Sequence, residues 1–189
     1  PPAPLRSPPA ASAALALSVR GLRKDFGRKR AVDGLDLDVR AGEFFGFLGP
    51  NGAGKSTTIR ILCGLMRPTA GRVEVAGVDV LANPVEVKRR IGILPEEPVI
   101  YERLTGREML WYAGRLHGLD GRLVEERSAD LLELMALGDD DAERPIVDYS
   151  MGMRKKIGLA CALVHRPRVL FLDEPFNGID PVTSRAING

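Results

Sequence analysis

The sequence predicts an α/β fold with a mainly parallel sheet, an N-terminal antiparallel β subdomain and a helical insert. Residues 31–40 alternate apolar and acidic side chains, as a half-buried antiparallel strand does. Two short apolar runs, residues 43–49 and 169–172, are typical of strands buried on both faces of a parallel sheet. Between these runs, residues 101–137 carry apolar side chains at helical spacing, which predicts the insert.

The N-terminal region divides into a tail and a first β-hairpin. Residues 1–14 are rich in Pro, Ala and Ser and offer little to bury, so we expect a disordered tail. Residues 15–20 form a predicted strand, and residues 31–40 supply a second one. Residues 10–19 (AASAALALSV) resemble the apolar part of a secretory signal, but Leu15, Leu17 and Val19 alternate with small or polar neighbours and no clear cleavage site follows. We therefore expect residues 15–189 to form one domain.

The central region contains the elements of a strand–loop–helix unit. Residues 43–49 (EFFGFLG) are predicted to form a buried central strand that ends in glycine. Ile59, Leu62 and Leu65 are spaced as one face of the helix that follows. A turn signal (RPTAGR) then precedes a short strand at residues 73–75.

The helical insert is placed at about residues 101–150. Thr105 and Glu108 fit a capping box ahead of the first helical stretch, MLWYAGRLHG. A second stretch, LVEERSADLLELMALG, is expected to stop at Gly138.

Composition excludes several classes of protein. Apolar residues make up 44% of the 189-residue chain and charged residues 28%, which is a globular rather than a disordered balance. The net charge is only +2 and both signs are mixed along the chain, so no nucleic-acid partner is expected. No apolar run approaches the roughly 20 residues that span a bilayer. Cys63 and Cys161 lie far apart, and we expect two buried thiols rather than a disulfide or a metal site.

The segment GPNGAGKST carries the strongest chemical signal. It fits the pattern G-x-x-x-x-G-K-[ST], with a predicted strand before it and a predicted helix after it. Its glycines let backbone N–H groups turn towards phosphate oxygens, its lysine reaches the β- and γ-phosphates, and its serine hydroxyl is a ligand for Mg²⁺. A chance glycine-rich turn is the alternative, but the flanking elements argue against it. The residues of this predicted nucleotide site are Gly49, Pro50, Asn51, Gly52, Ala53, Gly54, Lys55, Ser56 and Thr57.

The segment VLFLDE supplies a partner for this loop. A buried strand at residues 169–172 delivers Asp173 and Glu174 to its carboxyl end, where ligand sites of parallel sheets form. We expect Asp173 to hold the Mg²⁺ shell and Glu174, as the catalytic residue, to polarise the water that attacks the γ-phosphate. An acidic pair that merely caps the next segment is the alternative. The two motifs together predict a P-loop NTPase core that binds a nucleoside triphosphate and Mg²⁺.

From residue 15 onwards, the order of the motifs resembles the nucleotide-binding domain of the ATP-binding cassette (ABC) transporter family. Phe26 matches the family's aromatic residue that stacks on adenine, although it would also fit the core of a hairpin. Glu96, in IGILPEEP, stands where the family usually has a glutamine that contacts Mg²⁺ and water. A carboxylate can ligate Mg²⁺ as well, but two glutamates on a solvated loop are the alternative. Asp180, in FNGID, resembles the residue of the family that faces the dimer partner.

The segment YSMGM falls where the family has its signature, Leu-Ser-Gly-Gly-Gln. Ser150 and Gly152 match, whereas Tyr149, Met151 and Met153 depart from the commonest residues. A serine hydroxyl and free N–H groups at a helix start suit the γ-phosphate of ATP held by an opposite protomer. An ordinary serine N-cap is the alternative.

The resemblance implies an ATP-binding subunit of an exporter-type ABC transporter, which binds ATP and Mg²⁺ and hydrolyses ATP. Its expected partners are a second ATP-binding subunit, in a head-to-tail homo- or heterodimer, and an integral membrane permease at the cytoplasmic face of the membrane. A non-transport ABC ATPase in DNA maintenance or on the ribosome, and a regulatory module that binds ATP without turnover, remain alternatives. The family has a γ-phosphate-sensing histidine beyond Gly189, so we expect a C-terminally truncated chain that binds ATP but hydrolyses it poorly. His117 and His165 are expected to be surface or structural residues.

Overall fold

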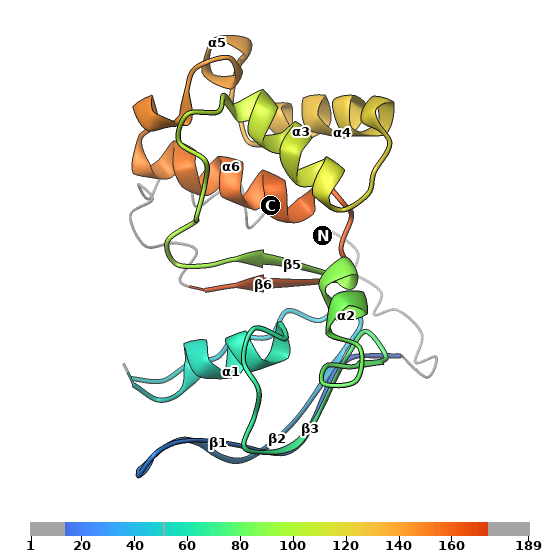
Figure 1. The fold of residues 1–189 in the computed structure, drawn as a ribbon, viewed down its shortest axis with the longest axis vertical. Helices are drawn as coiled ribbons and strands as arrows, with labels where there is room; N and C mark the ends of the chain where they lie inside the picture. The colour runs from blue at the N-terminus through green and yellow to red at the C-terminus, as the bar shows by residue number, and fades with distance from the viewer. Residues whose placement is uncertain (1–13, 51, 174–189) are drawn as a thin grey trace, which may run out of the picture.

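The computed structural model of the chain describes residues 14–50 and 52–173. Its N-terminal part is a four-stranded antiparallel sheet in the order β2-β1-β3-β4 (Figure 1). The predicted hairpin is confirmed, since β1 and β2 pair along their length from Leu15 opposite Arg40 to Phe26 opposite Lys29. The predicted strand at residues 73–75 lies in the same sheet, on the other side of β1. The strands are β1 (Leu15–Phe26), β2 (Lys29–Arg40), β3 (Ala70–Val75) and β4 (Val78–Asp79).

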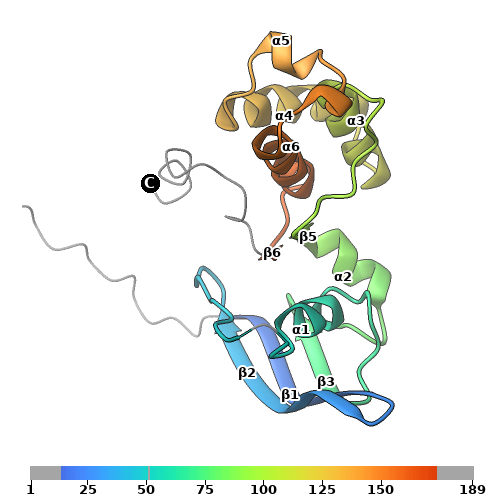
Figure 2. The same ribbon diagram turned by 90° about the vertical axis from the view of Figure 1, so that its left-hand side faces the viewer.

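A second sheet in the described part of the chain consists of two parallel strands, β5 (Ile91–Leu94) and β6 (Val169–Leu172). They pair in register from Ile91 opposite Val169 to Leu94 opposite Leu172, so both carboxyl ends lie at the same edge. Along the chain, the helix α1 (Lys55–Leu62) lies between β2 and β3, and α2 (Pro84–Arg90) lies between β4 and β5. Figures 1 and 2 show β5 and β6 between α1 on one side and α6 on the other. The predicted strand at residues 169–172 is confirmed.

The helices predicted between residues 101 and 137 are present in the described part of the chain. Thr105 accepts a hydrogen bond from the Glu108 backbone N–H, and the Glu108 side chain accepts one from the Thr105 N–H, so the predicted capping box is present. The predicted stop at Gly138 is wrong, because the helix ends at Leu134 and Ala136 takes the left-handed conformation (φ 50°); Gly138 instead precedes the next helix. The helical elements are α3 (Gly106–Leu116), α4 (Gly121–Leu134), α5 (Asp139–Ala142), the 3-10 turn η1 (Ile146–Asp148) and α6 (Met151–Leu163).

The prediction of a buried central strand at residues 43–49 is wrong. No regular strand forms there, and Phe44 and Leu48 are 107% and 97% exposed. A parallel strand is held by hydrogen bonds to a neighbour on each side, and no described strand pairs with this segment. Only Phe47 packs partly against the core, so the apolar run alone could not establish the strand.

Two apolar cores hold these layers together. The first joins the antiparallel sheet to α1, α2 and the parallel strands, and includes Ile61, Val75 and Phe171. The second joins the helices α3 to α6, where Leu110, Ile146 and Ile157 are fully buried. The helices α3 to α6 therefore pack around an apolar core that is distinct from the core beneath the antiparallel sheet. Among the described residues, no helix is long and apolar enough to cross a lipid bilayer.

Candidate functional site

The loop before α1 has the backbone that its sequence predicts. Gly54 has φ 87°, a conformation that favours glycine, and a Cβ on it would lie 2.3 Å from the carbonyl oxygen of Ala31. The helix α1 begins directly after it, at Lys55. Because the first N–H groups of a helix have no partner within the helix, they remain available to an anion at this end. Lys55 Nζ donates to the carbonyl oxygens of Gly49 (2.6 Å) and Pro50 (3.2 Å), which holds the ammonium group over the loop.

A cleft of about 660 Å³ brings this loop together with two distant predicted residues. Phe26 lines it from the end of β1, and Glu96 lines it from the segment after β5. Phe26 is 47% exposed, and Lys24 Nζ lies 5.0 Å from the centroid of its ring. Phe26 is therefore not buried in a core of the hairpin, which was the alternative interpretation. The predicted loop residues in the lining are Gly52, Ala53, Gly54, Lys55, Ser56 and Thr57.

Two lining residues of this cleft are missed by the sequence motifs. Lys29 and Ala31 come from the start of β2, which the hairpin places beside Phe26. The basic run at residues 28–30 precedes Ala31, and it was the only signal in the sequence that could have pointed to a phosphate partner here. The Ala31 carbonyl is also the atom against which Gly54 packs.

The candidate Mg²⁺ ligands lie beside a second cleft of about 350 Å³. Ser56 Oγ donates to Asp173 Oδ1 over 3.3 Å, and Ser56, Glu96 and Asp173 all line this cleft. The Asp173 backbone N–H donates to the carbonyl of Leu94 (2.9 Å), which fixes the carboxylate at the shared carboxyl edge of β5 and β6. In residues 14–50 and 52–173 no cluster of three or more His, Cys, Asp or Glu side chains could hold a metal by itself.

This donor set fits Mg²⁺ bound together with a nucleotide. Mg²⁺ prefers oxygen ligands and usually takes one or two protein groups along with phosphate oxygens and water. A serine hydroxyl hydrogen-bonded to an aspartate at the carboxyl edge of a parallel sheet supplies such groups. Glu96 is exposed and lines both clefts, so its carboxylate is within the same region.

Ser150 and Gly152 lie apart from these clefts. Ser150 is the N-cap of α6, and its Oγ accepts a hydrogen bond from the Met153 N–H (3.2 Å). Neither Ser150 nor Gly152 lines the cleft that contains Phe26 or the cleft that contains Asp173. In Figures 1 and 2 the strands β5 and β6 separate α6 from α1. Ser150 is therefore exposed at the surface and lies away from residues 49–57 (the phosphate loop) of its own chain.

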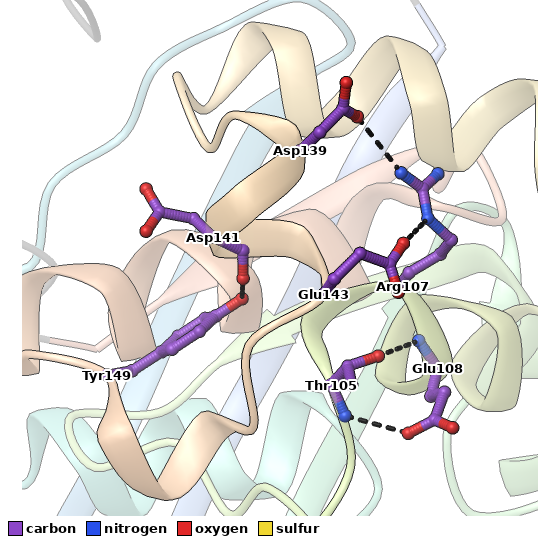
Figure 3. A network of polar contacts seen from close by, with 7 residues as sticks. All are labelled: Thr105, Arg107, Glu108, Asp139, Asp141, Glu143 and Tyr149. Carbon is purple, nitrogen blue, oxygen red and sulfur yellow. Dashed lines mark hydrogen bonds and ion pairs between the residues drawn. The ribbon is translucent and has the colours of Figure 1, made fainter.

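The residue before the N-cap anchors the start of α6 in the insert. Tyr149 is 5% exposed, and its hydroxyl donates to the carbonyl oxygen of Asp141 over 2.5 Å (Figure 3). A Cβ on Gly106 would lie 2.4 Å from this hydroxyl, so the close approach requires glycine at that position. The tyrosine that departs from the family signature thus has a structural contact of its own.

The histidines and cysteines lie outside the two clefts described above, except Cys63. The rings of His117 and His165 stack with centroids 3.6 Å apart, and His165 Nε2 is 2.9 Å from the carbonyl oxygen of Ile91. Cys63 is buried and lines the Asp173 cleft, whereas Cys161 is half-buried. Burial raises the pKa of each thiol to about 12, so both are unreactive thiols rather than nucleophiles.

Three predicted site residues lie outside the described residues: Asn51, Glu174 and Asp180. Their roles stay predictions.

Comparison with known proteins agrees with this geometry. A family profile described as ABC transporter matches residues 32–177. The daunorubicin resistance ATP-binding protein DrrA3 of Streptomyces coeruleorubidus is 47% identical over 166 residues, which is 88% of this chain and 52% of that protein. The bacitracin transport ATP-binding protein BcrA of Bacillus licheniformis is 40% identical over 161 residues, which is 85% of this chain and 51% of that protein. The chain thus spans about half the length of these relatives.

Solved structures with the same fold include an ATP-binding subunit of an ABC transporter. It is 33% identical, with a TM-score of 0.83 over 91% of this chain and 71% of that one. A dimeric post-hydrolysis state of the ATP-binding cassette MJ0796, bound to ADP and Pi, has a TM-score of 0.82 at 23% identity, over 90% of this chain and 79% of that one, and shows the shared fold. From the profile match, the identity to its relatives and this fold, we conclude that the chain belongs to the ABC transporter family of ATP-binding proteins.

Proposed function

We propose that this chain is an ATP-binding, ATP-hydrolysing subunit of an ABC transporter that powers a membrane permease. The observation that carries the proposal is the cleft of about 660 Å³ in which Phe26, the phosphate loop and Glu96 meet. Its neighbouring cleft adds the pair Ser56–Asp173, with 3.3 Å between the hydroxyl and carboxylate oxygens. An aromatic face, a loop of N–H donors and hard oxygen ligands together suit a nucleoside triphosphate with Mg²⁺.

Each residue of the cleft has a role in this proposal. Phe26 stacks on the adenine ring, and the N–H groups from residue 52 to the start of α1 surround the β- and γ-phosphates. Lys55 exchanges its contacts with the Gly49 and Pro50 carbonyls for phosphate oxygens. Ser56, Asp173 and Glu96 would hold Mg²⁺, which when bound would supply positive charge beside the phosphate oxygens. Glu174 polarises the attacking water, as its place after Asp173 in the sequence suggests.

The site is completed by a second protomer. Ser150 and Gly152 present a hydroxyl and helix N–H groups away from the phosphate loop of their own chain, where they can meet the γ-phosphate of ATP held by an opposite subunit. Two subunits would then close head to tail around two ATP molecules, as a homo- or heterodimer, with Asp180 facing the partner. A dimeric cassette among the structural neighbours supports this arrangement.

The relatives favour export through a separately encoded permease. Their names describe resistance to daunorubicin and transport of bacitracin, rather than DNA maintenance or work on the ribosome. We place the chain at the cytoplasmic face of the cell membrane through that permease, with residues 15–189 as the ATP-binding domain.

The test separates ATP binding by one protomer from dimer formation. In the Ser150→Ala variant, a fluorescent ATP analogue should bind the monomer as in the parent chain, because Ser150 lines neither cleft. Sedimentation with Mg²⁺ and a non-hydrolysable ATP analogue should then show weaker dimerisation. Loss of monomer binding in this variant would refute the contact with an opposite subunit.

A further inference from the structure

Arg154 bonds to several groups around the start of α6. It lies on the first turn of the helix, where its N–H closes the first hydrogen bond to the Ser150 carbonyl (2.9 Å). Its guanidinium donates from Nη2 to the Val147 carbonyl (3.1 Å) and from Nε, over a longer 3.4 Å, to the Tyr149 carbonyl. Nη1 forms an ion pair with the Glu102 carboxylate. One side chain thus joins three points of the backbone and side chains around Ser150.

Glu102 connects this cluster to the segment that carries Glu96. It lies at the end of the stretch that leaves β5, only six positions beyond Glu96. The same stretch pairs with the backbone before α6: Val147 N–H donates to the Glu102 carbonyl (2.8 Å), and Ile146 N–H to the Leu104 carbonyl (2.9 Å). The Arg154–Glu102 ion pair therefore adds to the backbone hydrogen bonds that join residues 102–104 to residues 146–147; together these contacts form the Arg154–Glu102 bridge.

The chemistry of the bridge requires arginine. A planar guanidinium can donate in several directions at once, whereas a lysine ammonium is a single point charge on a flexible stem. Arg154 is about half as exposed as Glu102, with side-chain exposures of 27% and 53%. Hydrogen bonds from a charged donor are also the stronger ones, and two of the acceptors are backbone carbonyls of the turn that sets the position of Ser150.

We infer that Arg154 is a positioning residue of the composite ATP site, which holds Ser150 and Gly152 in place by tying the start of α6 to Glu102. This inference rests on the proposed function, because it assumes that Ser150 and Gly152 contact ATP bound to an opposite subunit. Arg154 itself touches neither cleft of its own chain. Its removal acts on dimerisation through the geometry of Ser150, not on the binding of ATP to one protomer.

The test uses Arg154→Ala, Arg154→Lys and Glu102→Gln, with Arg107→Ala as a matched control. Arg107 also forms ion pairs inside the insert, to Glu143 (2.6 Å) and Asp139 (3.3 Å), but none to residues 145–154 (Figure 3). Thermal unfolding and binding of a fluorescent ATP analogue are measured first on monomers. The dimer dissociation constant with Mg²⁺ and a non-hydrolysable ATP analogue is then measured by sedimentation.

We expect Arg154→Ala to raise the dimer dissociation constant roughly tenfold or more, since two or three charge-assisted hydrogen bonds are lost. Arg154→Lys should recover part of this loss, and Glu102→Gln should cause a smaller loss. Glu102→Gln combined with Arg154→Ala should be no weaker than Arg154→Ala alone. All variants should bind the analogue as monomers within twofold of the parent, and Arg107→Ala should dimerise like the parent.

Two sets of results separate the possible failures. If Ser150→Ala weakens dimerisation but Arg154→Ala and Glu102→Gln do not, the positioning role is wrong and the composite site stands. Equal losses of monomer ATP binding and dimerisation in Arg154→Ala, with no effect of Glu102→Gln, would show a merely structural arginine and overturn the inference. A parent chain that stays monomeric with ATP would contradict both proposals.

Discussion

At the residue scale, Ser56 and Asp173 are the pair that we propose as ligands of Mg²⁺. Ser56 is the second residue of α1 and Asp173 follows β6, so 117 positions of sequence separate two oxygens that lie 3.3 Å apart. The contact depends on β6 lying in register with β5, because the Asp173 N–H is held by the Leu94 carbonyl (2.9 Å). A substitution that keeps this geometry but removes the charge of Asp173 isolates the electrostatic contribution of that carboxylate to ATP binding.

Asp173→Asn is such a substitution. The side-chain amide oxygen can still accept from Ser56 Oγ, and the backbone N–H of residue 173 still donates to the Leu94 carbonyl. The side chain, however, no longer carries the negative charge that would attract Mg²⁺. We expect ATP affinity in the presence of Mg²⁺ to fall roughly tenfold, the loss of one charged contact, while affinity in EDTA stays unchanged. Titration of a fluorescent ATP analogue with and without Mg²⁺ measures both. An equal loss under the two conditions would mean that Asp173 acts on the fold instead.

The same scale shows what the motifs could predict. Gly54, Lys55 and Ser56 were predicted because a phosphate loop fixes their types at fixed spacing, and the structure places them on one cleft. Lys29, Ala31 and Arg154 were not predicted as site residues. Their contacts depend on the β1–β2 turn and on residues 102–105 running beside residues 145–147. Neither arrangement produces a residue pattern of fixed spacing that could be recognised in the sequence.

At the element scale, the packing of α3 against the start of α6 depends on one missing methyl group. Gly106 begins α3 and leaves room for the Tyr149 hydroxyl, which would lie 2.4 Å from an added Cβ. Gly106→Ala should lower the free energy of unfolding by about 1–3 kcal/mol, the usual cost of overpacking. Tyr149→Phe should lower it by about 1 kcal/mol, because the Asp141 carbonyl loses its donor.

The double variant Gly106→Ala/Tyr149→Phe separates these causes. Without the hydroxyl the added methyl group has space, so the double variant should be more stable than the sum of the single effects predicts. Urea unfolding followed by circular dichroism gives the three free energies. Strict additivity would show that the hydroxyl does not limit the space at Gly106.

From the stacked pair His117 and His165 we expect the folded chain to lose stability in mild acid. Burial lowers the pKa of both rings; the charge of His165 lowers the pKa of His117 further, and that of Arg127 lowers the pKa of His165 against the opposing hydrogen bond to Ile91. The unfolded chain therefore binds more protons than the folded one below about pH 6.5. The free energy of unfolding should be fully retained above that pH and fall as the pH decreases through it.

His117→Gln tests this expectation. The chain has only two histidines, so the window between about pH 5 and 7 belongs mainly to this pair. Urea unfolding at several pH values should show a shallower loss of stability in the variant than in the parent. Identical slopes in both proteins would exclude the stack as the source of the acid sensitivity.

Helices and strands were predicted correctly where the signal comes from residues close together in the sequence. The Thr105–Glu108 capping box and the alternation of residues 31–40 are local signals, and both structures formed as expected. Residues 43–49 failed because an apolar run becomes a strand only beside suitable neighbours. The stop at Gly138 failed because Ala136 already takes the left-handed conformation that ends α4, against its usual preference.

At the scale of the whole molecule, the predicted site residues fall into two groups. Phe26, the phosphate loop, Glu96 and Asp173 line neighbouring clefts, whereas Ser150 and Gly152 line neither of them. These two residues belong to the start of α6, and α6 lies on the other side of the β5–β6 pair from α1 (Figure 2). Sequence alone could suggest both groups but could not show that one chain keeps them apart. This separation is the physical reason to expect a site shared between two subunits.

The most direct measurement mixes two defective variants. Lys55→Ala lacks the lysine that we propose binds phosphate, and Ser150→Ala lacks the hydroxyl at the start of α6, so neither alone should form an intact shared site. In a mixed head-to-tail dimer, the phosphate loop of the Ser150→Ala subunit meets the intact Ser150 of the Lys55→Ala subunit. Sedimentation with Mg²⁺ and a non-hydrolysable ATP analogue should therefore show dimers in the mixture, with one analogue bound per dimer, and few in either variant alone. A mixture that behaves as the sum of its two components would contradict the shared site.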